Sequence, residues 1–399
     1  MIEKYPLPEG WRWVRLEEVC ATAETRDPGI SPNLPFRYVD ISSVDNLLKR
    51  ITEARTILGK DAPSRARQII HANDVLIATT SPNLNAVALV PKELDNDICS
   101  TGFCVLRPIE VDPLFLFMFV QTQYFIEIIS GQVRGMLYPA VTDTQIRKVY
   151  LPLPPLSEQK RISTRLQELM QEVERARTAI ERQLEAARAL PATYIREVFE
   201  NEEAKRWERK RLGEVCGIDS NQVLPNTYST RQLPYIGLEH IENETGRIID
   251  KINDLDGKII QSITFRFDTR HVLYGKLRPY LNKVVTSDFE GRCTTELLPL
   301  LPKDGCDRYY LAWLLRRTET VEEAMRHKTG TRMPRADMDE LFKMLVPLPP
   351  LPEQKRIASE LKEKMAEVEN LQSAIRNQQS ALDALPQAIL RKAFSGDLG

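Results

Sequence analysis

Lysine and arginine side chains gather in three windows of this sequence, 49–67, 266–283 and 326–335, and their chemistry suits phosphate binding. Lys and Arg neutralise phosphates, and Arg can read guanine through two hydrogen bonds in the major groove of DNA. Each window therefore predicts a DNA contact, and the alternative for each is a charged face exposed to water. The candidate contacts are Lys49, Arg50, Lys60, Arg65 and Arg67 in the first window, Lys276, Arg278, Tyr280 and Lys283 in the second, and Lys328, Thr329, Thr331, Arg332 and Arg335 in the third, together with Arg134 and Tyr138.

The third window is the most specific of the three. Its sequence, RHKTGTRMPR, contains four basic residues and no acidic one, in a chain whose net charge is only −1. Gly330 would allow the loop to approach another backbone closely. Any DNA-binding surface must be local, because residues 1–150 carry 16 basic and 18 acidic side chains.

Motifs for catalysis are missing from the sequence. It has no GxGxxG, no GxxxxGK[ST] and no D/N-P-P-Y/F/W methyltransferase motif, and its four histidines do not have metal-ligand spacing. Glu158-x-Lys160 and Glu353-x-Lys355 resemble the E-x-K of some nucleases, but both pairs open a helix directly after PLPP. We therefore predict no catalytic, cofactor or metal site in the chain, and ordinary hydrogen-bonding roles for His240 and His271.

Composition points to a cytoplasmic protein with no membrane partner. No run approaches eighteen apolar residues, and the first residues lack the apolar stretch of a signal peptide. The six cysteines form no CxxC pair. Cysteines 20 and 216, and 99 and 293, occupy equivalent positions of an internal repeat, which predicts buried thiols in a reducing compartment.

That internal repeat organises the whole chain. Residues 151–162 read LPLPPLSEQKRI and residues 346–357 read VPLPPLPEQKRI, with ten of twelve positions identical at an offset of 195. Weaker matches continue on both sides, so the chain divides into a lobe, a helical segment, a second lobe and a second helical segment. The predicted boundaries are 1–150, 151–200, 201–345 and 346–399.

Each lobe shows short strand-like runs followed by an apolar helical run. NDVLIATTS and RHVLYGKLRP illustrate the strands, and residues 113–130 and 308–326 the helices. The fold class predicted from this pattern is α+β, with two pseudo-repeated mixed lobes and two long helices. The PLPP segments are expected to leave each lobe in a stiff, extended conformation.

The two helical segments have a heptad pattern. Apolar residues are spaced alternately by about four and three positions, which predicts an antiparallel coiled coil, with each helix ended or kinked by Pro191 or Pro386. The alternative is an amphipathic helix that packs only on its own lobe. The predicted seam residues are Ile162, Leu166, Leu169, Val173, Ala176, Ile180, Ala187 and Leu190 in the first segment, and Ile357, Leu361, Val368, Leu371, Ile375, Leu382 and Leu385 in the second.

Taken together, these motifs resemble the specificity (S) subunit of type I restriction–modification systems. The resemblance rests on the two PLPPLxEQKRI segments, on VLYGKLRPYLNK at 272–283, on CSTGFCVLRP at 99–108 and on the ending ALPQAILRKAFSGDL. It implies two target recognition domains that each read half of a bipartite DNA site. It also implies helices that dock two methyltransferase subunits, further restriction and translocase subunits, and S-adenosylmethionine and ATP bound by those partners.

One segment departs from the family pattern. Lobe one has IATTSPNLNAV where the second lobe has YGKLRPYLNKV, which weakens the case for phosphate contacts at residues 79–83. Two rival functions stay open at this stage. One is a fused protein with its own methylation or cleavage activity, and the other is a coiled-coil scaffold whose lobes bind protein or carbohydrate.

Overall fold

The computed structural model describes all residues except 1–5, 132–138, 226–232, 254–259 and 398–399. Its contacts divide the chain into two compact units. The first unit contains residues 1–181 and 377–399, and the second contains residues 182–376. We call the globular parts of these units lobe one (residues 6–153) and lobe two (residues 204–347).

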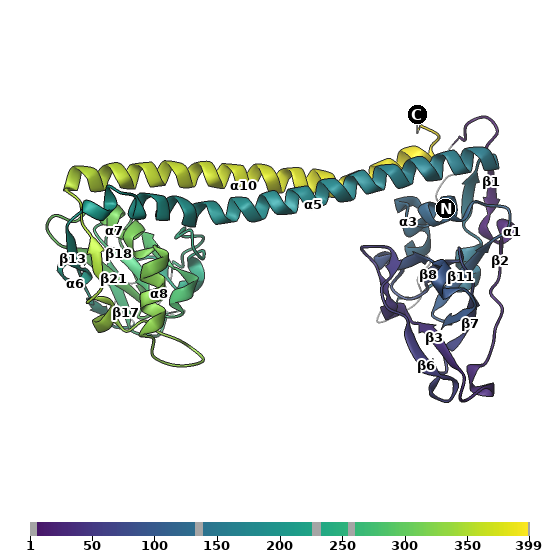
Figure 1. Ribbon diagram of the computed structural model, residues 1–399, viewed down its shortest axis with the longest axis horizontal. Coiled ribbons are helices and arrows are strands. Elements are labelled where there is room, and N and C mark those ends of the chain that lie inside the picture. The colour runs from purple at the N-terminus through teal and green to yellow at the C-terminus, as the bar shows by residue number, and fades with distance from the viewer. Residues whose placement is uncertain (1–5, 132–138, 226–232, 254–259, 398–399) are drawn as a thin grey trace. The chain divides into compact units, whose positions relative to one another are not determined.

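Lobe one is a mixed α and β structure (Figure 1). Its described strands form sheets in the orders β6-β3-β10-β7, β2-β11-β8-β9 and β1-β12, and β4 pairs with β5 in a hairpin. The helices are α1 (Leu16–Val19), α2 (Pro113–Phe119), α3 (Gln123–Gly131) and α4 (Asp143–Arg147). The strands are β1 (Arg12–Arg15), β2 (Cys20–Ala21), β3 (Pro35–Val39), β4 (Val44–Asp45), β5 (Arg50–Ile51), β6 (Arg55–Leu58), β7 (Ala66–Ile70), β8 (Val75–Ala78), β9 (Val87–Leu89), β10 (Asp97–Ser100), β11 (Phe103–Pro108) and β12 (Tyr150–Leu153).

Lobe two repeats most of this topology, but its edge strand β15 pairs with β17, whereas the lobe-one edge strand β6 pairs with β3. Its described sheets have the orders β14-β21-β18-β19, β15-β17-β20-β16 and β13-β22, and the parallel pair β16 and β20 corresponds to β3 and β10. The helices are α6 (Leu212–Val215), α7 (Arg308–Leu315), α8 (Thr318–Arg326) and α9 (Met338–Leu341). The strands are β13 (Arg209–Arg211), β14 (Cys216–Ile218), β15 (Gln222–Val223), β16 (Tyr235–Ile236), β17 (Thr264–Phe267), β18 (Val272–Gly275), β19 (Val284–Thr286), β20 (Gly291–Thr294), β21 (Leu297–Pro302) and β22 (Leu345–Pro347).

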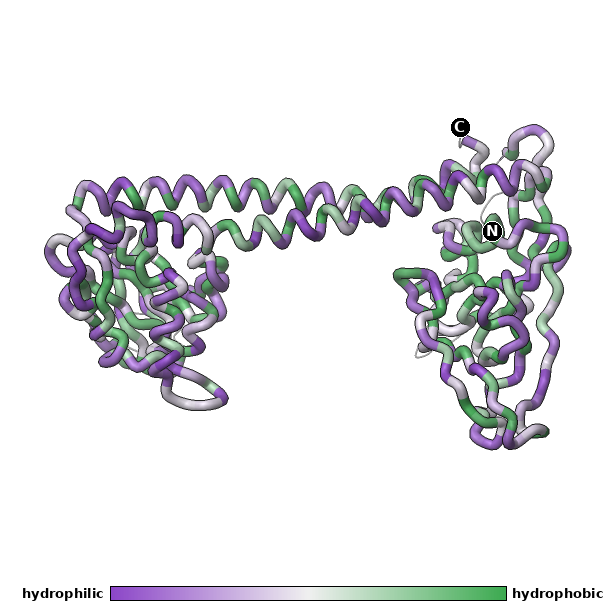
Figure 2. Tube along the Cα trace, viewed as in Figure 1, coloured by the Kyte–Doolittle hydropathy of each residue, from purple (hydrophilic) through white to green (hydrophobic). Residues whose placement is uncertain are grey.

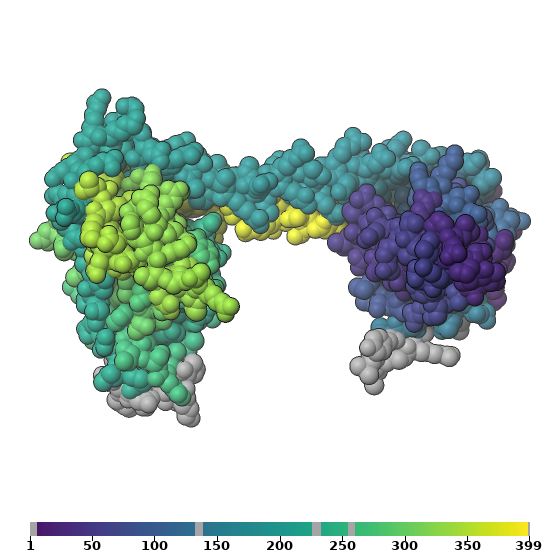
Figure 3. All heavy atoms as spheres, turned by 60° about the horizontal axis from the view of Figure 1, so that its bottom comes forward, coloured from purple at the N-terminus to yellow at the C-terminus, as the bar shows by residue number. Residues whose placement is uncertain are grey.

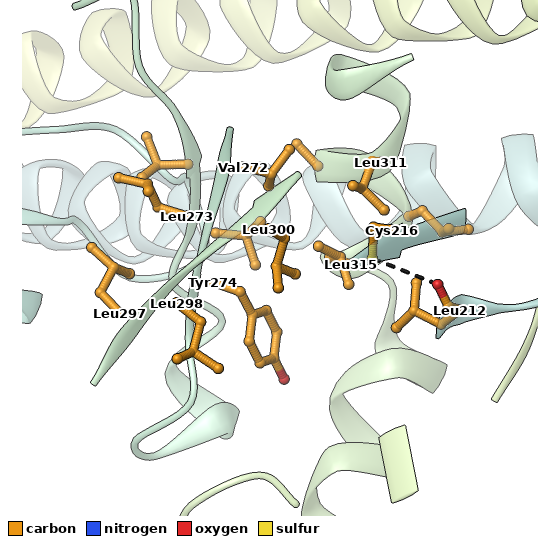
Figure 4. Packing of buried hydrophobic residues seen from close by; sticks show 14 of the residues in the cluster. Leu212, Cys216, Val272, Leu273, Tyr274, Leu297, Leu298, Leu300, Leu311 and Leu315 are labelled. Carbon is orange, nitrogen blue, oxygen red and sulfur yellow. Dashed lines mark hydrogen bonds between the residues drawn. The ribbon is translucent and has the colours of Figure 1, made fainter. Parts of the chain in front are cut away.

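The lobes are held by apolar cores, which appear as hydrophobic interiors in Figure 2. Strands β8 and β18 are buried at every position, so both of their faces are covered. In β8, Val75 and Ile77 pack in one apolar cluster and Leu76 and Ala78 in another. Figure 4 shows Val272, Leu300 and Leu311 packed together in lobe two, where Cys216 Sγ also donates to Leu212 O. All six cysteines are free and five are buried, and burial raises the pKa of the Cys216 thiol to about 12. The prediction of buried thiols at the repeat positions is confirmed.

The apolar helical run in lobe one packs in the core of that lobe. Among the described residues no single helix is long and apolar enough to cross a bilayer, although α2 and α3 together pass that test as a pair bent by 63°. Phe115, Phe119 and Phe125 of this pair are fully buried in the core of lobe one.

The long helices are α5 (Leu156–Glu200) and α10 (Leu351–Phe394). The prediction that Pro191 and Pro386 would end or kink them was wrong about the ends, because both prolines lie inside a continuous helix. Proline removes the hydrogen bond to the carbonyl four residues earlier. For Pro191 that carbonyl belongs to Ala187, and it accepts a hydrogen bond from Gln372 Nε2 of α10 at 3.1 Å.

Beyond each proline, the helix end enters a lobe core. Ile195 and Phe199 of α5 pack in lobe two, and Leu390 and Phe394 of α10 pack in lobe one. The alternative of a helix packed on its own lobe holds for the helix starts, because Ile162 and Leu166 of α5 lie in the core of lobe one and Ile357 and Leu361 of α10 in that of lobe two.

Within each unit the two helices run antiparallel. In the first unit Arg177 Nη2 of α5 donates to Asp383 Oδ1 of α10 at 2.9 Å, and in the second Gln372 meets Ala187. Val173, Val368 and Ile375 of the predicted seam are buried, but Leu371 and Leu385 are 45% and 43% exposed. Those two leucines were wrongly placed in the seam. Overall, the predicted α+β class with two repeated mixed lobes and two long antiparallel helices is confirmed.

The repeated PLPPLxEQKRI segment has a structural explanation. Pro152 and Leu153 belong to β12 and Pro347 to β22, which pair with β1 and β13, so each PLPP exit begins in a sheet. The following glutamines are buried. Gln159 Oε1 accepts from Asp112 N at 2.8 Å, and Gln354 Oε1 accepts from Asp307 N at 2.8 Å. These bonds fasten each long helix to the residue that caps the first apolar helix of its lobe.

Candidate nucleic-acid interface

A short turn with unusual backbone angles occupies the same place in both lobes. Residues 81–85 and 278–282 each form one turn of 3-10 helix flanked by residues in the left-handed region. The φ angles are 48° and 47° at Ser81 and Asn85, and 53° and 49° at Arg278 and Asn282. Such angles are uncommon outside glycine, and Asn tolerates them better than Ser or Arg.

The asparagine that ends each turn also caps a helix. Asn85 Nδ2 donates to Val120 O at 2.8 Å, and Asn282 Nδ2 donates to Arg316 O at 2.9 Å. Val120 and Arg316 are the C-terminal caps of α2 and α7. The repeated Leu-Asn pair is therefore a fixed joint between the turn and the apolar helix behind it.

In lobe two this turn is hydrogen-bonded to the basic loop 326–335. Arg278 N donates to Pro334 O at 2.6 Å, and Thr329 and Arg335 exchange backbone hydrogen bonds of 2.8 and 2.9 Å. Gly330, with a φ of 80°, allows the reversal. The loop leaves the end of α8 and lies at the surface of lobe two (Figures 1 and 3). The structure thus brings the second and third predicted windows together.

Four side chains of this cluster face solvent, and we call Arg278, Tyr280, Lys328 and Arg332 the lobe-two surface. All four are exposed, and Tyr280 is 49% exposed. No carboxylate of the described residues forms an ion pair with Arg278, Lys328 or Arg332. Thr331 is also exposed beside them, while Lys276 is half-buried. Unpaired cations around an exposed aromatic ring suit a phosphate backbone and the bases beside it.

Two candidates from the same windows have protein partners instead. Arg335 Nη2 and Nε contact Glu296 at 2.8 and 3.0 Å, and this ion pair raises the pKa of Arg335. Lys283 Nζ donates to Leu238 O at 2.6 Å, and burial lowers the pKa of Lys283. Thr329 is held by its backbone bonds to Arg335. Glu296 could not be identified from the sequence as the partner of Arg335, because the two residues are 39 positions apart.

The first window does not form one surface in lobe one. Lys49 Nζ donates to Asn85 O at 2.6 Å and Asn85 Oδ1 at 3.0 Å, and burial lowers the pKa of Lys49 to about 8. Arg50 is exposed in the β4–β5 hairpin. Lys60 and Arg65 are exposed on a different segment, where Arg67 contacts Asp27 at 3.5 Å.

The lobe-one counterpart of the basic loop is described only at its ends. Arg134 and Tyr138 lie outside the described residues. Ser81 N donates to Pro139 O at 2.8 Å, as Arg278 does to Pro334, and Thr80 bridges Ala140 as Leu277 bridges Arg335. The frame of the turn and loop is therefore repeated, although the side chains displayed on it differ.

The histidines lie in hydrogen-bonded turns. His240 Nδ1 accepts from Gly237 N, and His271 Nδ1 accepts from Asp268 N and its Nε2 lies 3.2 Å from Asp219. Across the described parts of the chain, no group of three or more His, Cys, Asp or Glu side chains could hold a metal ion.

A model described as the type I restriction modification DNA specificity domain matches residues 8–186 and again residues 204–378. The chain belongs to this family. The specificity-subunit resemblance seen in the sequence is therefore confirmed, and the two matches correspond to the two halves of the repeat.

Individual specificity subunits are similar over most of their length. The EcoDI specificity subunit of Escherichia coli is 28% identical over 74% of this chain and 72% of its own length. The MjaVIII specificity subunit of Methanocaldococcus jannaschii is 22% identical over 98% of this chain and 94% of its own.

Solved structures of the family agree with the fold. The HsdS subunit from Thermoanaerobacter tengcongensis is 34% identical, with a TM-score of 0.72 and coverage of 99% of both chains. A chain from a study of complex assembly and conformational transition in the type I system is also 34% identical, with a TM-score of 0.81 and coverage of 99% of this chain and 100% of that one. These matches support the specificity function over the predicted scaffold alternative.

Proposed function

We propose that each lobe of this specificity subunit reads one half of a bipartite DNA sequence and that the chain performs no catalysis. The observation that carries the proposal is the lobe-two surface, where Arg278, Lys328 and Arg332 are exposed without a carboxylate partner among the described residues. Arg278 is displayed on the turn 278–282, whose frame recurs in lobe one, and Lys328 and Arg332 on the loop that is hydrogen-bonded to this turn. A common frame with different side chains suits two lobes that read different bases.

The matched helical segments support a second part of the proposal, which concerns protein partners. Identical partners need identical docking surfaces, and the best conserved part of the repeat is the start of α5 and α10. We place two methyltransferase subunits there, with restriction and translocase subunits joining the same complex. S-adenosylmethionine and ATP then belong to those partners, since this chain carries no motif for either.

Binding of duplex DNA by the chain assembled with its partner methyltransferase tests the proposal. We expect Arg278→Gln and Arg332→Gln each to weaken binding by about 1–3 kcal/mol if the side chain contacts a base, and to lower the salt dependence if it contacts a phosphate. Arg270→Gln is the matched control, because Arg270 is an exposed arginine of the same lobe that already pairs with Asp268 at 2.6 Å. Equal affinity of all three variants and the wild type, at every salt concentration, would remove the lobe-two surface from the interface.

A further inference from the structure

A second basic site lies in the second unit, behind the turn 278–282, where Asn282 Nδ2 donates to Arg316 O. It is a pocket of about 750 Å³ between residues 246–248, the segment 285–288, helix α7 and the first turns of α10. Four cations line it, namely Arg308, Arg316, Lys355 and Lys362. Arg247 also borders the pocket, but its charge is taken by Glu242 and Glu369.

Arg316 is the innermost of these cations. Its side chain lies over the Trp313 ring, 4.6 Å from the ring centroid, and only 8% of the residue is exposed. The guanidinium donates to a single backbone acceptor, Val284 O, through Nε at 3.0 Å and Nη2 at 2.5 Å. No described carboxylate pairs with it, and burial lowers the pKa of Arg316 to about 10. A buried charge without a counter-ion is costly, so an anion that enters the pocket would be favoured.

The backbone is shaped around this arginine. Gly246 has a φ of 63°, and a Cβ atom there would lie 1.5 Å from Arg316 Nη2 and 2.0 Å from Val284 O. The hairpin that carries Gly246 can therefore approach the guanidinium only because this residue has no side chain. In lobe one, Lys49 occupies the repeat position of Gly246, and its own amine donates to Asn85 O.

The other three cations are nearer to solvent. Arg308 lies over the Tyr309 ring at 4.3 Å and donates to Ser287 O at 3.2 Å, while Lys355 and Lys362 are exposed on α10. The pocket contains two acids, Asp288 and Asp307. Asp307 is already used as the cap of α7, where its Oδ1 accepts from the backbone at 2.9 and 3.0 Å. The balance of charge in the pocket is positive.

This charge belongs to the second unit and not to the repeat. The repeat offset of 195 places Pro113 at the position of Arg308 and Gln167 at that of Lys362, and Val120 matches Arg316 as the C-terminal cap of its helix, while Lys160 alone keeps its charge. A ligand common to both halves of the chain would not explain three cations that only one half carries.

We propose that this pocket binds a phosphate group. Arg316 and Arg308 supply planar donors, the two lysines of α10 neutralise the remaining charge, and the Trp313 and Tyr309 rings provide faces for an attached base or sugar. The phosphate belongs either to a free nucleotide or to the DNA backbone. The proposal stands independently of half-site reading, because none of these residues belongs to the lobe-two surface.

The test is a titration of the full-length chain followed by tryptophan fluorescence, since Trp313 borders the pocket. The probes are ATP, pyrophosphate and a duplex oligonucleotide, each below 1 mM as an order of magnitude for a specific site, with ionic strength held constant by KCl. We expect a saturable change that Trp313→Phe abolishes. The double variant Lys355→Gln/Lys362→Gln should weaken binding at least about tenfold, which corresponds to ~1.4 kcal/mol. Lys160→Gln, at the lobe-one counterpart of Lys355, is the matched control and should leave the affinity for the probes unchanged.

The probes separate the two sources of phosphate. A response to ATP and pyrophosphate that depends on the two lysines assigns the pocket to a free phosphate ligand. A lysine-dependent response to the duplex alone assigns it to the DNA backbone. A lack of response to all three probes, or a response that the lysine variants leave intact, overturns the proposal. The half-site proposal would survive either of these last results, because it is judged by the arginines of the lobe-two surface.

Discussion

At the scale of single residues, Arg278 combines an unfavourable backbone with an exposed charge. Its φ of 53° is held by the hydrogen bond from its own N–H to Pro334 O. A left-handed conformation costs a non-glycine residue about 1 kcal/mol or more. Conformational cost of this kind collects at functional sites, which agrees with the exposed position of the side chain. Stability and DNA binding should therefore respond in opposite directions to a change at this residue.

Arg278→Gly tests whether stability rises while DNA binding falls. Glycine relieves the backbone cost, so we expect the melting temperature of the chain to rise by about 2–4 °C for each 1 kcal/mol gained. The same variant loses the guanidinium, so DNA affinity of the assembled complex should fall by about tenfold or more. Thermal unfolding and DNA titration measure the two effects. A variant that is more stable and binds DNA as well as the wild type would show that Arg278 has only a structural role.

Lys49 provides a prediction about pH. Burial lowers the pKa of its amine from 10.5 to about 8, so between these values the unfolded chain binds more protons at this site than the folded chain. Stability contributed by this residue must then rise as the pH increases from about 8 to 10.5, and below pH 8 the cost of the buried charge is fully present. Lys49→Met should remove this part of the pH dependence in denaturant unfolding. Lys60→Met, at an exposed lysine of the same lobe, should retain it. Parallel pH curves for wild type and Lys49→Met would contradict the expectation.

At the scale of elements, the buried glutamines join each long helix to its lobe. Gln354 Nε2 donates to Gly305 O and Pro349 O, both at 2.8 Å, while its Oε1 accepts from Asp307 N. Removal of this side chain leaves the backbone groups of Gly305, Asp307 and Pro349 without this partner, of which the Pro349 carbonyl bond is buried and the other two are part-buried. The start of α10 should therefore detach more easily from lobe two.

Gln354→Ala should destabilise the chain by about 1–3 kcal/mol, because it leaves one buried carbonyl and two part-buried backbone groups unpaired. Gln378→Ala is the control, because Gln378 is exposed on the same helix. Thermal unfolding of the two variants gives the comparison. Equal melting temperatures would mean that the hydrogen bonds of Gln354 do not hold α10 in place.

The same elements show what can be predicted from sequence. The heptad pattern predicted both long helices, because it is a local signal. The internal repeat predicted the two similar lobes, because it is present twice in the sequence. The continuation of α5 past Pro191 could not be predicted, because the contacts made there come from residues remote in sequence, such as Gln372, which bonds the free Ala187 carbonyl. The windows 266–283 and 326–335 were recognised as basic, but composition could not show that Glu296 neutralises Arg335 while Arg332 stays exposed. Nothing in the sequence indicated the pocket around Arg316, except that three of its four cations have no charged counterpart in lobe one.

At the scale of the whole molecule, the helices relate the two reading lobes to each other, and a change in helix length should change the DNA sequence recognised. The contact of Arg177 with Asp383 shows which residues of α5 and α10 are opposite each other in the first unit. Seven residues inserted after Ala176 and seven after Asp383 therefore preserve the heptad pattern and the pairing on both sides. Such insertions add ~10 Å of helix, or about three base pairs.

We expect these paired insertions to widen the unread gap of the methylated motif by about three base pairs and to leave both half-sites unchanged. Methylation mapping in a host that carries the partner methyltransferase gives the motif. An insertion after Ala176 alone is the control, because it lengthens one helix without its partner and should abolish modification. An active paired variant with the original gap would show that these helices do not set the distance between half-sites.

Methylation mapping of a genome modified by the same methyltransferase with either the wild-type chain or Arg332→Gln tests whether this chain alone chooses the DNA sequence, one half for each lobe. With the wild type we expect a bipartite motif. With Arg332→Gln we expect one half-site to relax, or modification to fall evenly, while the other half-site and the gap stay the same. An unbroken motif, or a variant that alters both halves, would show that the two lobes do not read separate half-sites.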